Sequence, residues 1–318
     1  MVKVSVIVPV FNSEKTIEDC LRNLVNQTLE EIELILVNDC STDRSLEYLL
    51  AFEHYFPDKI KVINLKENLG PGGARNVGLS YATGEYVGFV DSDDLLVVEM
   101  FEKLYKKAEE TGADIVECAF LDDEIGKPVI CTADEYTGLL DDRKKNGIVA
   151  IGGFLVTRIF KRILWNGVIM RSHTILEDLE PFILVVLNAH SLEKVPECLY
   201  RYRATEGSLS KPKDPEKYHM AITDAMDAIE TVVLKHAGYE GIKEAVDYRL
   251  FILAIHDLTN IDNLSNGLSS TRRRQMMSDL STRLKRMMSM PLIKNNTLMK
   301  MTDKESRRSI ERLLDIET

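Results

Sequence analysis

The sequence predicts an α/β fold, with a mostly parallel sheet, helices on both of its faces and a helical C-terminal region. Two patterns lead to this prediction. Up to about residue 120, short apolar runs typical of buried strands alternate with segments whose apolar residues recur at helical spacing. Such alternation implies parallel strands joined by right-handed crossovers. From residue 216 onward, helical spacing prevails and strand signals are few.

Four strands are expected in the first part of the chain, because each run is short and apolar enough to be buried on both faces of a sheet. Their sequences are "KVSVIVPVF", "IELILVNDC", "KIKVINL" and "EYVGFV". Helices are expected between them, the third one around 74–82. The pattern becomes irregular after Asp122, so we divide the chain into three parts, 1–120, 121–215 and 216–318.

Composition places the chain among ordinary soluble proteins, since 45% of its 318 residues are apolar and 29% are charged. The start lacks the features of a secretory signal, and the longest apolar run, "FILVVLNA", is far shorter than the roughly 20 residues that span a bilayer. We therefore expect a cytoplasmic protein. The five cysteines are scattered and odd in number, so unpaired thiols are expected.

The net charge of −11 argues against general nucleic-acid binding, but the charge is unevenly distributed. Residues 266–312 contain 12 Lys and Arg against 4 Asp and Glu, together with seven methionines. This basic segment either rests on anionic lipid at the inner face of the membrane or packs its methionines on the protein and leaves its arginines solvated. We favour packing, because no strong lipid-facing aromatic residue is present. Homodimer formation is left open.

Polar side chains follow three of the expected strands, with Asn12 after the first, Asp39 after the second, and Asp91 and Asp93 after the fourth. In extended chain, Asp91 and Asp93 point the same way and repel each other unless a cation lies between them. Mg²⁺ and Mn²⁺ take oxygen ligands and commonly bind together with substrate phosphates. The alternative is a solvated acidic turn that caps a helix. The end of a buried parallel strand favours the metal.

The segment "NLGPGGARNVGL", which begins at Asn68, has the pattern of a phosphate-binding glycine loop. It does not match the dinucleotide fingerprint, because Arg75 and Asn76 stand where the third glycine is required. The loop supplies flexible backbone, including Gly72, and one guanidinium that can donate to a base or a phosphate. The alternative is a loop whose Arg75 pairs with a surface acid.

The motifs "VSVIVPVFN", "LILVNDCSTDRS" and "NLGPGGARNVGLSYATGEYVGFVDSDD" resemble, in order and spacing, the nucleotide-binding half of family 2 glycosyltransferases, which have the GT-A fold. The resemblance implies an inverting enzyme that uses a nucleoside-diphosphate sugar, usually a UDP-sugar, with Mn²⁺ or Mg²⁺. A glycan or lipid-linked acceptor in cell-surface polysaccharide synthesis is expected. Residues 1–120 would then bind the sugar nucleotide, and 121–215 the acceptor.

The resemblance also implies roles for individual residues. Pro9 and Phe11 line the base pocket, Asp39 and Arg75 contact the base, and "DSD" meets the ribose and the metal, with Asp93 as the direct metal ligand and Asp91 beside it. The complete set of implied nucleotide-binding residues is Pro9, Phe11, Asn12, Asp39, Asn68, Gly72, Arg75, Asp91, Ser92 and Asp93.

An inverting transfer needs a base that deprotonates the acceptor hydroxyl. The segment "HTILEDLEPFILVVLNA" offers Glu177 and Asp178 just before an apolar helix, whose dipole favours an ionised carboxylate at this end. From the residues alone, a helix cap is the alternative. In the family a Glu-Asp pair at this place supplies the base. By that resemblance Asp178 is the base and Glu177 is its supporting neighbour.

Further along, "YRYRATEGSLS" resembles the loop that closes over the diphosphate in the family. Residues 204–206 lack the histidine that many relatives carry there, which puts a histidine metal ligand in doubt. Arg203, Ser208 and Ser210 could still meet phosphate oxygens, and the alternative is a polar surface loop. Trp165 stacks either on an acceptor sugar or in the core.

Two other functions compete with glycosyl transfer. A sugar nucleotidyltransferase carries its glycine-rich phosphate loop directly after the first strand, where this chain reads "PVFNSEKT". A non-catalytic nucleotide-sugar-binding protein would need neither Asp93 nor Asp178.

Overall fold

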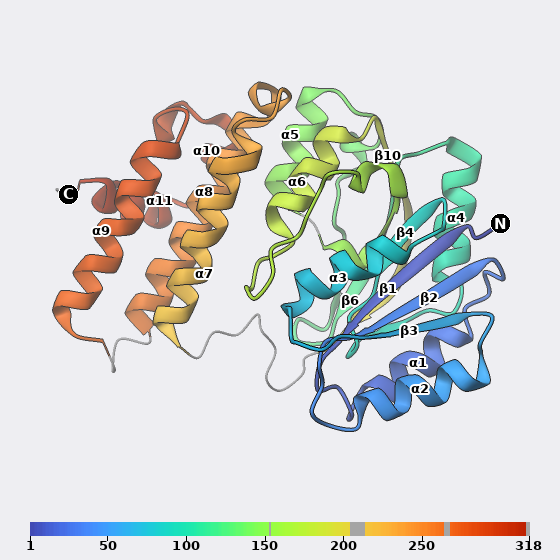
Figure 1. Cartoon of the computed structure of the whole chain (residues 1–318). Coiled ribbons are helices and arrows are strands. Elements are labelled where there is room, and N and C mark those ends of the chain that lie inside the picture. The colour runs from blue at the N-terminus through green and yellow to red at the C-terminus, as the bar shows by residue number, and fades with distance from the viewer. Residues whose placement is uncertain (153, 204–213, 264–267, 316–318) are drawn as a thin grey trace. The chain divides into compact units, whose positions relative to one another are not determined.

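The computed structural model describes residues 1–152, 154–203, 214–263 and 268–315. Contacts divide the chain into two compact units. An α/β unit comprises Met1–Asp141 and continues in residue 152 and in 154–203, and a helical unit comprises Asp142–Ile151 and continues in 214–263 and 268–315. Figure 1 shows the sheet and its helices in the first unit and a set of long helices in the second.

The α/β unit contains one sheet of ten strands in the described residues, in the order β3-β2-β1-β4-β9-β6-β10-β5, with β7 beside β6 and β8 beside β10. Strands β3, β2, β1 and β4 are parallel, as predicted, and so are β6 and β10. β9 runs antiparallel to β4 and β6 and joins these two parallel groups. The strands are β1 Val4–Val10, β2 Ile32–Asn38, β3 Ile60–Asn64, β4 Tyr86–Phe89, β5 Leu95–Leu96, β6 Ile115–Asp122, β7 Lys127–Val129, β8 Gly138–Leu139, β9 Arg158–Lys161 and β10 Ser191–Tyr202.

Helices cover both faces of this sheet, which confirms the predicted fold class (Figure 1). Because side chains alternate along a strand, the even-numbered valines of β1 pack in one core with apolar residues of α1 and α4. Ile7 points to the other face, where a Cβ added to Gly78 of α3 would lie 2.4 Å from its Cγ2. Only glycine allows this close approach. The helices are α1 Ile17–Val25, α2 Ser45–Tyr55, α3 Gly70–Tyr81, α4 Met100–Thr111 and α6 Leu179–Asn188.

Trp165 is a core residue of the α/β unit and is only 5% exposed. Its ring centroid lies 5.1 Å from that of Phe89 and 5.5 Å from that of Phe160, both in edge-to-face arrangements. Stacking of this indole on an acceptor sugar is therefore excluded, and the core alternative is correct.

One element of the predicted 121–215 part belongs to the other unit. The helix α5, Asp142–Ile151, packs against α8, and the side chain of Asn146 accepts a hydrogen bond from the backbone N–H of Ala245 at 2.9 Å. This helix was not predicted, because the sequence pattern of the region is irregular. Its packing partners lie about a hundred residues further along the chain. The functional division of the chain into three parts stays a prediction.

The helical periodicity predicted from residue 216 is confirmed. Helix α7 begins after Asp214, whose side chain accepts from two backbone N–H groups of the first turn. The helices of this unit are α5 Asp142–Ile151, α7 Pro215–Ala228, a π-helical turn Ile229–Val233, α8 Tyr239–Asn263, α9 Ser270–Met287, α10 Asn296–Met301 and α11 Lys304–Leu314. None of the helices in the described part of the chain is long and apolar enough to cross a bilayer.

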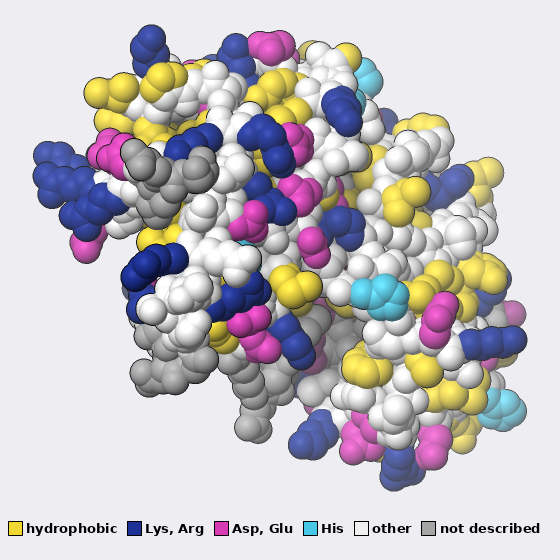
Figure 2. Space-filling view, turned by 60° about the vertical axis from the view of Figure 1, so that its left-hand side comes forward, with side chains coloured by type: hydrophobic (Ala, Val, Ile, Leu, Met, Phe, Trp, Pro, Cys, Tyr) yellow, Lys and Arg dark blue, Asp and Glu magenta, His cyan; other side chains and the backbone are white. Residues whose placement is uncertain are grey.

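Within the described residues 268–312, several basic side chains and methionines are engaged in the helical unit. Arg283 of α9 donates to Asp227 of α7 at 3.0 Å, and Arg286 donates to Glu230 at 2.5 Å. Met276 is 1% and Met287 3% exposed. On the face shown in Figure 2, basic side chains lie among acidic and apolar ones. These contacts support packing over lipid binding.

We therefore expect the full chain to stay in the soluble fraction when it is floated with liposomes that contain phosphatidylserine. Four arginines of α9, Arg272, Arg273, Arg283 and Arg286, already have carboxylate partners, so fewer are available for anionic headgroups. Density-gradient flotation at low and high salt measures this. Salt-sensitive recovery with the liposomes that is lost in a Lys294→Glu, Lys300→Glu variant would contradict the expectation.

Candidate active site

The carboxyl ends of β1, β2 and β4 meet at one edge of the sheet, as the sequence predicts. Val10 of β1 is in register with Asn38 of β2, and Ile7 of β1 with Phe89 of β4. The polar residues that follow these strands are thereby brought together from positions up to 80 residues apart in the chain. Such an edge is where parallel sheets bind their ligands.

The end of β1 contributes Pro9, Phe11 and Asn12. Pro9 is the penultimate residue of the strand, and Phe11 follows it with 49% of its surface exposed. Asn12 has a φ of 48°, and its side-chain oxygen accepts from the backbone N–H of Thr42 at 2.8 Å. Asn12 therefore ties the loop after β1 to the loop after β2, and the exposed ring of Phe11 stands at the edge where a base pocket is predicted.

Asp39 and Asn68 lie together beneath the start of α3. The carboxylate of Asp39 accepts from the backbone N–H of Leu69 at 2.6 Å, and the amide of Asn68 donates to the carbonyl of Asp39 at 3.0 Å. Burial raises the pKa of Asp39, although the hydrogen bonds from Leu69 and Gly70 act against this. Asp39 thus anchors the first turn of α3, and its contact with a nucleotide base stays a prediction.

The predicted glycine loop is a helix. α3 begins at Gly70, so Gly72 and Gly73 lie in its first turn and are buried, and the expectation of flexible backbone there is wrong. A Cβ on Gly72 would lie 2.2 Å from the carbonyl oxygen of Arg171 and 2.9 Å from the side chain of Glu177. The glycines are thus required for close packing of 171–177 on α3. Contact of Gly72 with the nucleotide stays a prediction.

Arg75 is a buried guanidinium between two carboxylates, with only 6% of its surface exposed. Its Nη2 lies 2.7 Å from Oδ1 of Asp91, and its Nη1 donates to Glu177. Burial alone would lower the pKa of this guanidinium, but Asp91, Glu177 and Asp178 together raise it. Arg75 therefore links the acidic turn to the Glu-Asp pair. The predicted contact of Arg75 with the base remains untested.

Residues 91–94 form a turn rather than extended chain, because the backbone N–H of Asp94 donates to the carbonyl of Asp91 at 3.1 Å. The expectation that Asp91 and Asp93 point the same way along a strand is therefore wrong. Asp91 faces Arg75, and the hydroxyl of Ser92 lies 2.7 Å from that of Ser13. Asp94 points into the core and is fully buried. The side chains of this turn therefore lie in different environments, one beside Arg75, one beside Ser13 and one in the core.

Two residues, Tyr200 in β10 and Arg203 just after it, hold this turn, and no role for Tyr200 was predicted from the sequence. The hydroxyl of Tyr200 donates to Asp94 at 2.6 Å and accepts from the backbone N–H of Asp91. The backbone N–H of Arg203 donates to Asp94 at 2.8 Å, and its side chain donates to the carbonyl of Asp93. Burial and the nearby Asp91 raise the pKa of Asp94 to about 8. A buried tyrosine needs a hydrogen-bond partner for its hydroxyl. This need is the one feature of the sequence that could have indicated the contact.

The donor set at the turn fits a metal that arrives with a diphosphate. Within the described ranges, no group of three or more His, Cys, Asp or Glu side chains is arranged to hold an ion by itself. Mg²⁺ and Mn²⁺, however, are often held by one or two carboxylates and complete their shell with substrate phosphates. Asp94 is fully buried, whereas Asp93 is partly exposed at the same turn, so Asp93 stays the candidate ligand that the family resemblance implies.

Glu177 and Asp178 immediately precede α6. Glu177 is 8% exposed and paired with Arg75. Asp178 occupies the N-cap position of α6, yet its side chain makes no capping hydrogen bond, so the cap alternative does not account for this carboxylate. Burial, followed by the charge of Glu177, raises the pKa of Asp178 to about 7, against the effect of Arg75. A carboxylate with such a pKa is suited to accept a proton near neutral pH.

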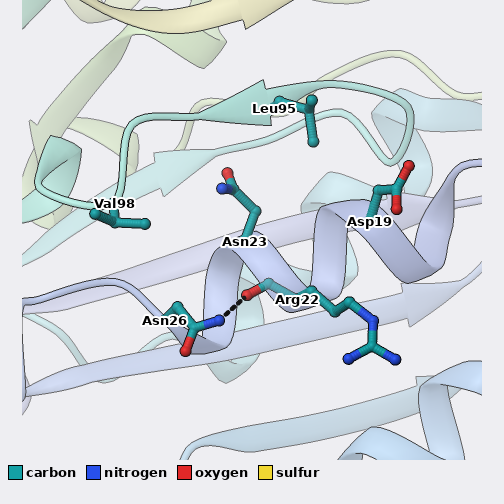
Figure 3. Close-up of a pocket in the computed structure, with 6 residues that line it drawn as sticks. All are labelled: Asp19, Arg22, Asn23, Asn26, Leu95 and Val98. Carbon is teal, nitrogen blue, oxygen red and sulfur yellow. Dashed lines mark hydrogen bonds between the residues drawn. The ribbon is translucent and has the colours of Figure 1, made fainter.

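A shallow pocket of about 310 Å³ lies beside α1, and none of the residues that line it is a predicted nucleotide-binding residue. Asp19 and Asn23 point from α1 toward Leu95 (Figure 3). Asp19 lies 3.6 Å from Nη1 of Arg203, whose Nε donates to the carbonyl of Asp93, so the pocket lies next to the acidic turn. The remaining predicted residues of the closing loop, 204–206, Ser208 and Ser210, lie outside the described residues.

Comparison with known proteins supports a common family. The family model described as Glycosyl transferase family 2 matches residues 5–152. TuaG of Bacillus subtilis, whose name connects it with teichuronic acid biosynthesis, is 31% identical over 219 residues, which cover 66% of this chain and 82% of TuaG. The glycosyltransferase GlyA of Streptococcus pneumoniae is 31% identical over 283 residues, which cover 85% of this chain and 39% of GlyA.

The chain thus spans about two fifths of GlyA, and it spans a third of EpsJ of Bacillus subtilis, with which it is 47% identical over 118 residues. Among solved structures, residues 1–349 of TarS from S. aureus superpose with a TM-score of 0.69 at 25% identity, covering 89% of this chain and 81% of that one. The protein therefore belongs to glycosyltransferase family 2 and has the GT-A fold.

Proposed function

We propose that the protein is an inverting glycosyltransferase that moves a sugar from a UDP-sugar to a hydroxyl of a glycan or lipid-linked acceptor. One observation carries this proposal. Arg75 joins Asp91 of the acidic turn to Glu177, and Asp178, a carboxylate with a raised pKa, comes next in the chain. The residues proposed to bind the donor and the residue proposed to accept the proton thus lie near one another, as a single displacement requires.

In the proposed reaction, Asp178 accepts the proton of the acceptor hydroxyl while the hydroxyl oxygen attacks the anomeric carbon. A new glycosidic C–O bond forms as the bond to the diphosphate breaks, and the diphosphate leaves with the electron pair. Glu177 supports Asp178 and, through Arg75, keeps it at a set place relative to the acidic turn. Attack from the face opposite the leaving group inverts the anomeric configuration.

A divalent ion held by Asp93 and the diphosphate would offset the charge that develops on the leaving group. TarS has been solved with UDP-GlcNAc and with UDP, and the mannosyltransferase PcManGT from Pyrobaculum calidifontis with GDP-Man and Mn²⁺. Those ligands belong to those proteins. They support our proposal that this chain uses a sugar nucleotide and a divalent ion. The connection of TuaG with teichuronic acid supports a role in cell-surface polysaccharide synthesis.

Family membership favours transfer over both alternatives. A sugar nucleotidyltransferase needs a phosphate-binding loop after β1, but there Asn12 is committed to the loop after β2. A protein that only binds nucleotide sugars has no use for Asp178, a half-buried carboxylate without a capping hydrogen bond.

A donor panel tests the proposal directly. We expect UDP release from at least one UDP-sugar, and weak or no nucleotide release from GDP- and TDP-sugars. Activity should be lost with EDTA and restored by MnCl₂ or MgCl₂, and Asp93→Asn should raise the metal concentration needed for half-maximal rate. Full activity in EDTA, with no response to either ion, would rule out the metal part of the proposal.

The variant Asp178→Asn removes the proton acceptor while keeping the size and shape of the side chain. We expect turnover to fall by on the order of 100-fold or more, with the affinity for UDP nearly unchanged. Steady-state kinetics and calorimetric titration with UDP measure the two quantities. Asp58→Asn, an exposed position of the same unit, is the matched control. Turnover equal to that of the wild type would remove Asp178 from the reaction.

The raised pKa of Asp178 predicts the pH dependence. Only the ionised carboxylate accepts a proton, so kcat/KM should fall as the pH drops through about 7 and the carboxyl group becomes protonated. Further below that pH, the decline should approach about tenfold per pH unit. Rates measured across this range, each checked by return to neutral pH, provide the test. A flat profile down to about pH 5 would contradict the assignment.

A further inference from the structure

The segment that carries the proposed base is docked on α3 by its backbone. The side-chain amide of Asn76 donates to the carbonyl of Met170 at 2.7 Å and accepts from the N–H of the same residue at 3.0 Å. The carbonyl of Arg171 lies where a Cβ on Gly72 would stand, and the N–H of His173 donates to the carbonyl of Leu69 at 2.9 Å. The start of this segment is therefore fixed on the donor-binding half.

Between that docked start and α6, the chain makes a turn that needs support. Leu176 has a φ of 62°, a left-handed conformation that is costly for a residue with a branched side chain and persists only when its surroundings hold it. Asp178 follows two residues later, and its own carboxylate makes no hydrogen bond to the helix. The position of that carboxylate thus depends on the backbone of 176–180.

One side chain spans this turn. Nη2 of Arg171 donates to the carbonyl of Leu176 at 2.7 Å, and Nε donates to Oε1 of Glu180 at 2.6 Å. A third contact of 3.3 Å joins Nη2 to the other oxygen of Glu180. Glu180 is 3% exposed, and burial raises its pKa while Arg171 acts against this. The fork of a guanidinium can hold a carbonyl and a carboxylate together, whereas an ammonium group cannot match this geometry.

We propose that Arg171 is a positioning residue for the reaction: it fixes the turn from Leu176 to Glu180 and so sets the place of the Asp178 carboxylate against the donor. The inference rests on the proposed function, because it assigns Arg171 an effect that acts through the base. Arg171 holds residues on both sides of Asp178, two positions before it and two after it, while its own backbone is locked on α3.

A double-mutant cycle separates this role from a general contribution to stability. Arg171→Lys, Asp178→Asn and the double variant are compared by UDP release from UDP-GlcNAc with MnCl₂, or from the UDP-sugar of the panel that reacts faster. We expect Arg171→Lys to lower kcat by about 10- to 100-fold with little change in KM, because misplacing a reacting group by about 1 Å has effects of this size. In the Asp178→Asn background, the same change should have no further effect.

Glu180→Gln provides a second variant from the other side of the contact. It keeps the size of the side chain and one acceptor oxygen, so we expect a smaller loss of kcat that also disappears in the Asp178→Asn background. Arg162→Lys is the matched control, since Arg162 is exposed and its Nε donates only to the carbonyl of Gly84 at 2.8 Å among the contacts of the described residues. Thermal unfolding of each variant confirms that it is folded.

The outcomes distinguish this inference from the proposed function. Unchanged kcat in both Arg171→Lys and Glu180→Gln would overturn the positioning role, and so would an equal loss in the presence and absence of the Asp178 carboxylate. Full turnover by Asp178→Asn alone would refute the base assignment itself. If turnover falls in Asp178→Asn but is unchanged in Arg171→Lys, only the inference about Arg171 is refuted.

Discussion

The arrangement of the site depends on one buried cation. Arg75 projects from α3 between Asp91 and Glu177, which come from segments 86 residues apart in the chain. Burying a guanidinium is costly, and removing one partner of a buried ion pair typically costs about 3–5 kcal/mol. The two carboxylates repay the burial of Arg75, and Arg75 in turn allows three acidic side chains, Asp91, Glu177 and Asp178, to lie close together.

Arg75 can contact both of its carboxylate partners only because the backbone around it is closely packed. Gly72 leaves room for the carbonyl of Arg171 and for the side chain of Glu177, and Gly78 leaves room for Ile7 of β1. Glycines in a helix are intrinsically unfavourable by roughly 1 kcal/mol each relative to alanine. Here they bring α3 against the sheet on one side and against the base-bearing segment on the other, so that Arg75 reaches both of its partners.

A second set of contacts also holds the acidic turn. It comes from β10, which lies near the other end of the strand order from β3. Tyr200 in β10 and Arg203 just after it each donate one hydrogen bond to Asp94, at 2.6 and 2.8 Å. The hydroxyl of Tyr200 also accepts from the N–H of Asp91. Asp94 is thereby withdrawn into the core, while Asp93 remains partly exposed. A turn of like charges is thus stable because each carboxylate has a different environment, and a bound cation is not its only means of support.

The sequence by itself determined that β1 to β4 run parallel, that the C-terminal unit is helical and that Asp39 and Asp91 lie at one sheet edge. Apolar periodicity and the alternation of strands and helices are local signals. Tertiary structure alone decided that Gly72 lies in the first turn of a helix and that Asp91 pairs with Arg75. It also decided that Tyr200 holds Asp94. These contacts join residues far apart in the chain, and no local pattern records which partner a buried charge or hydroxyl will meet.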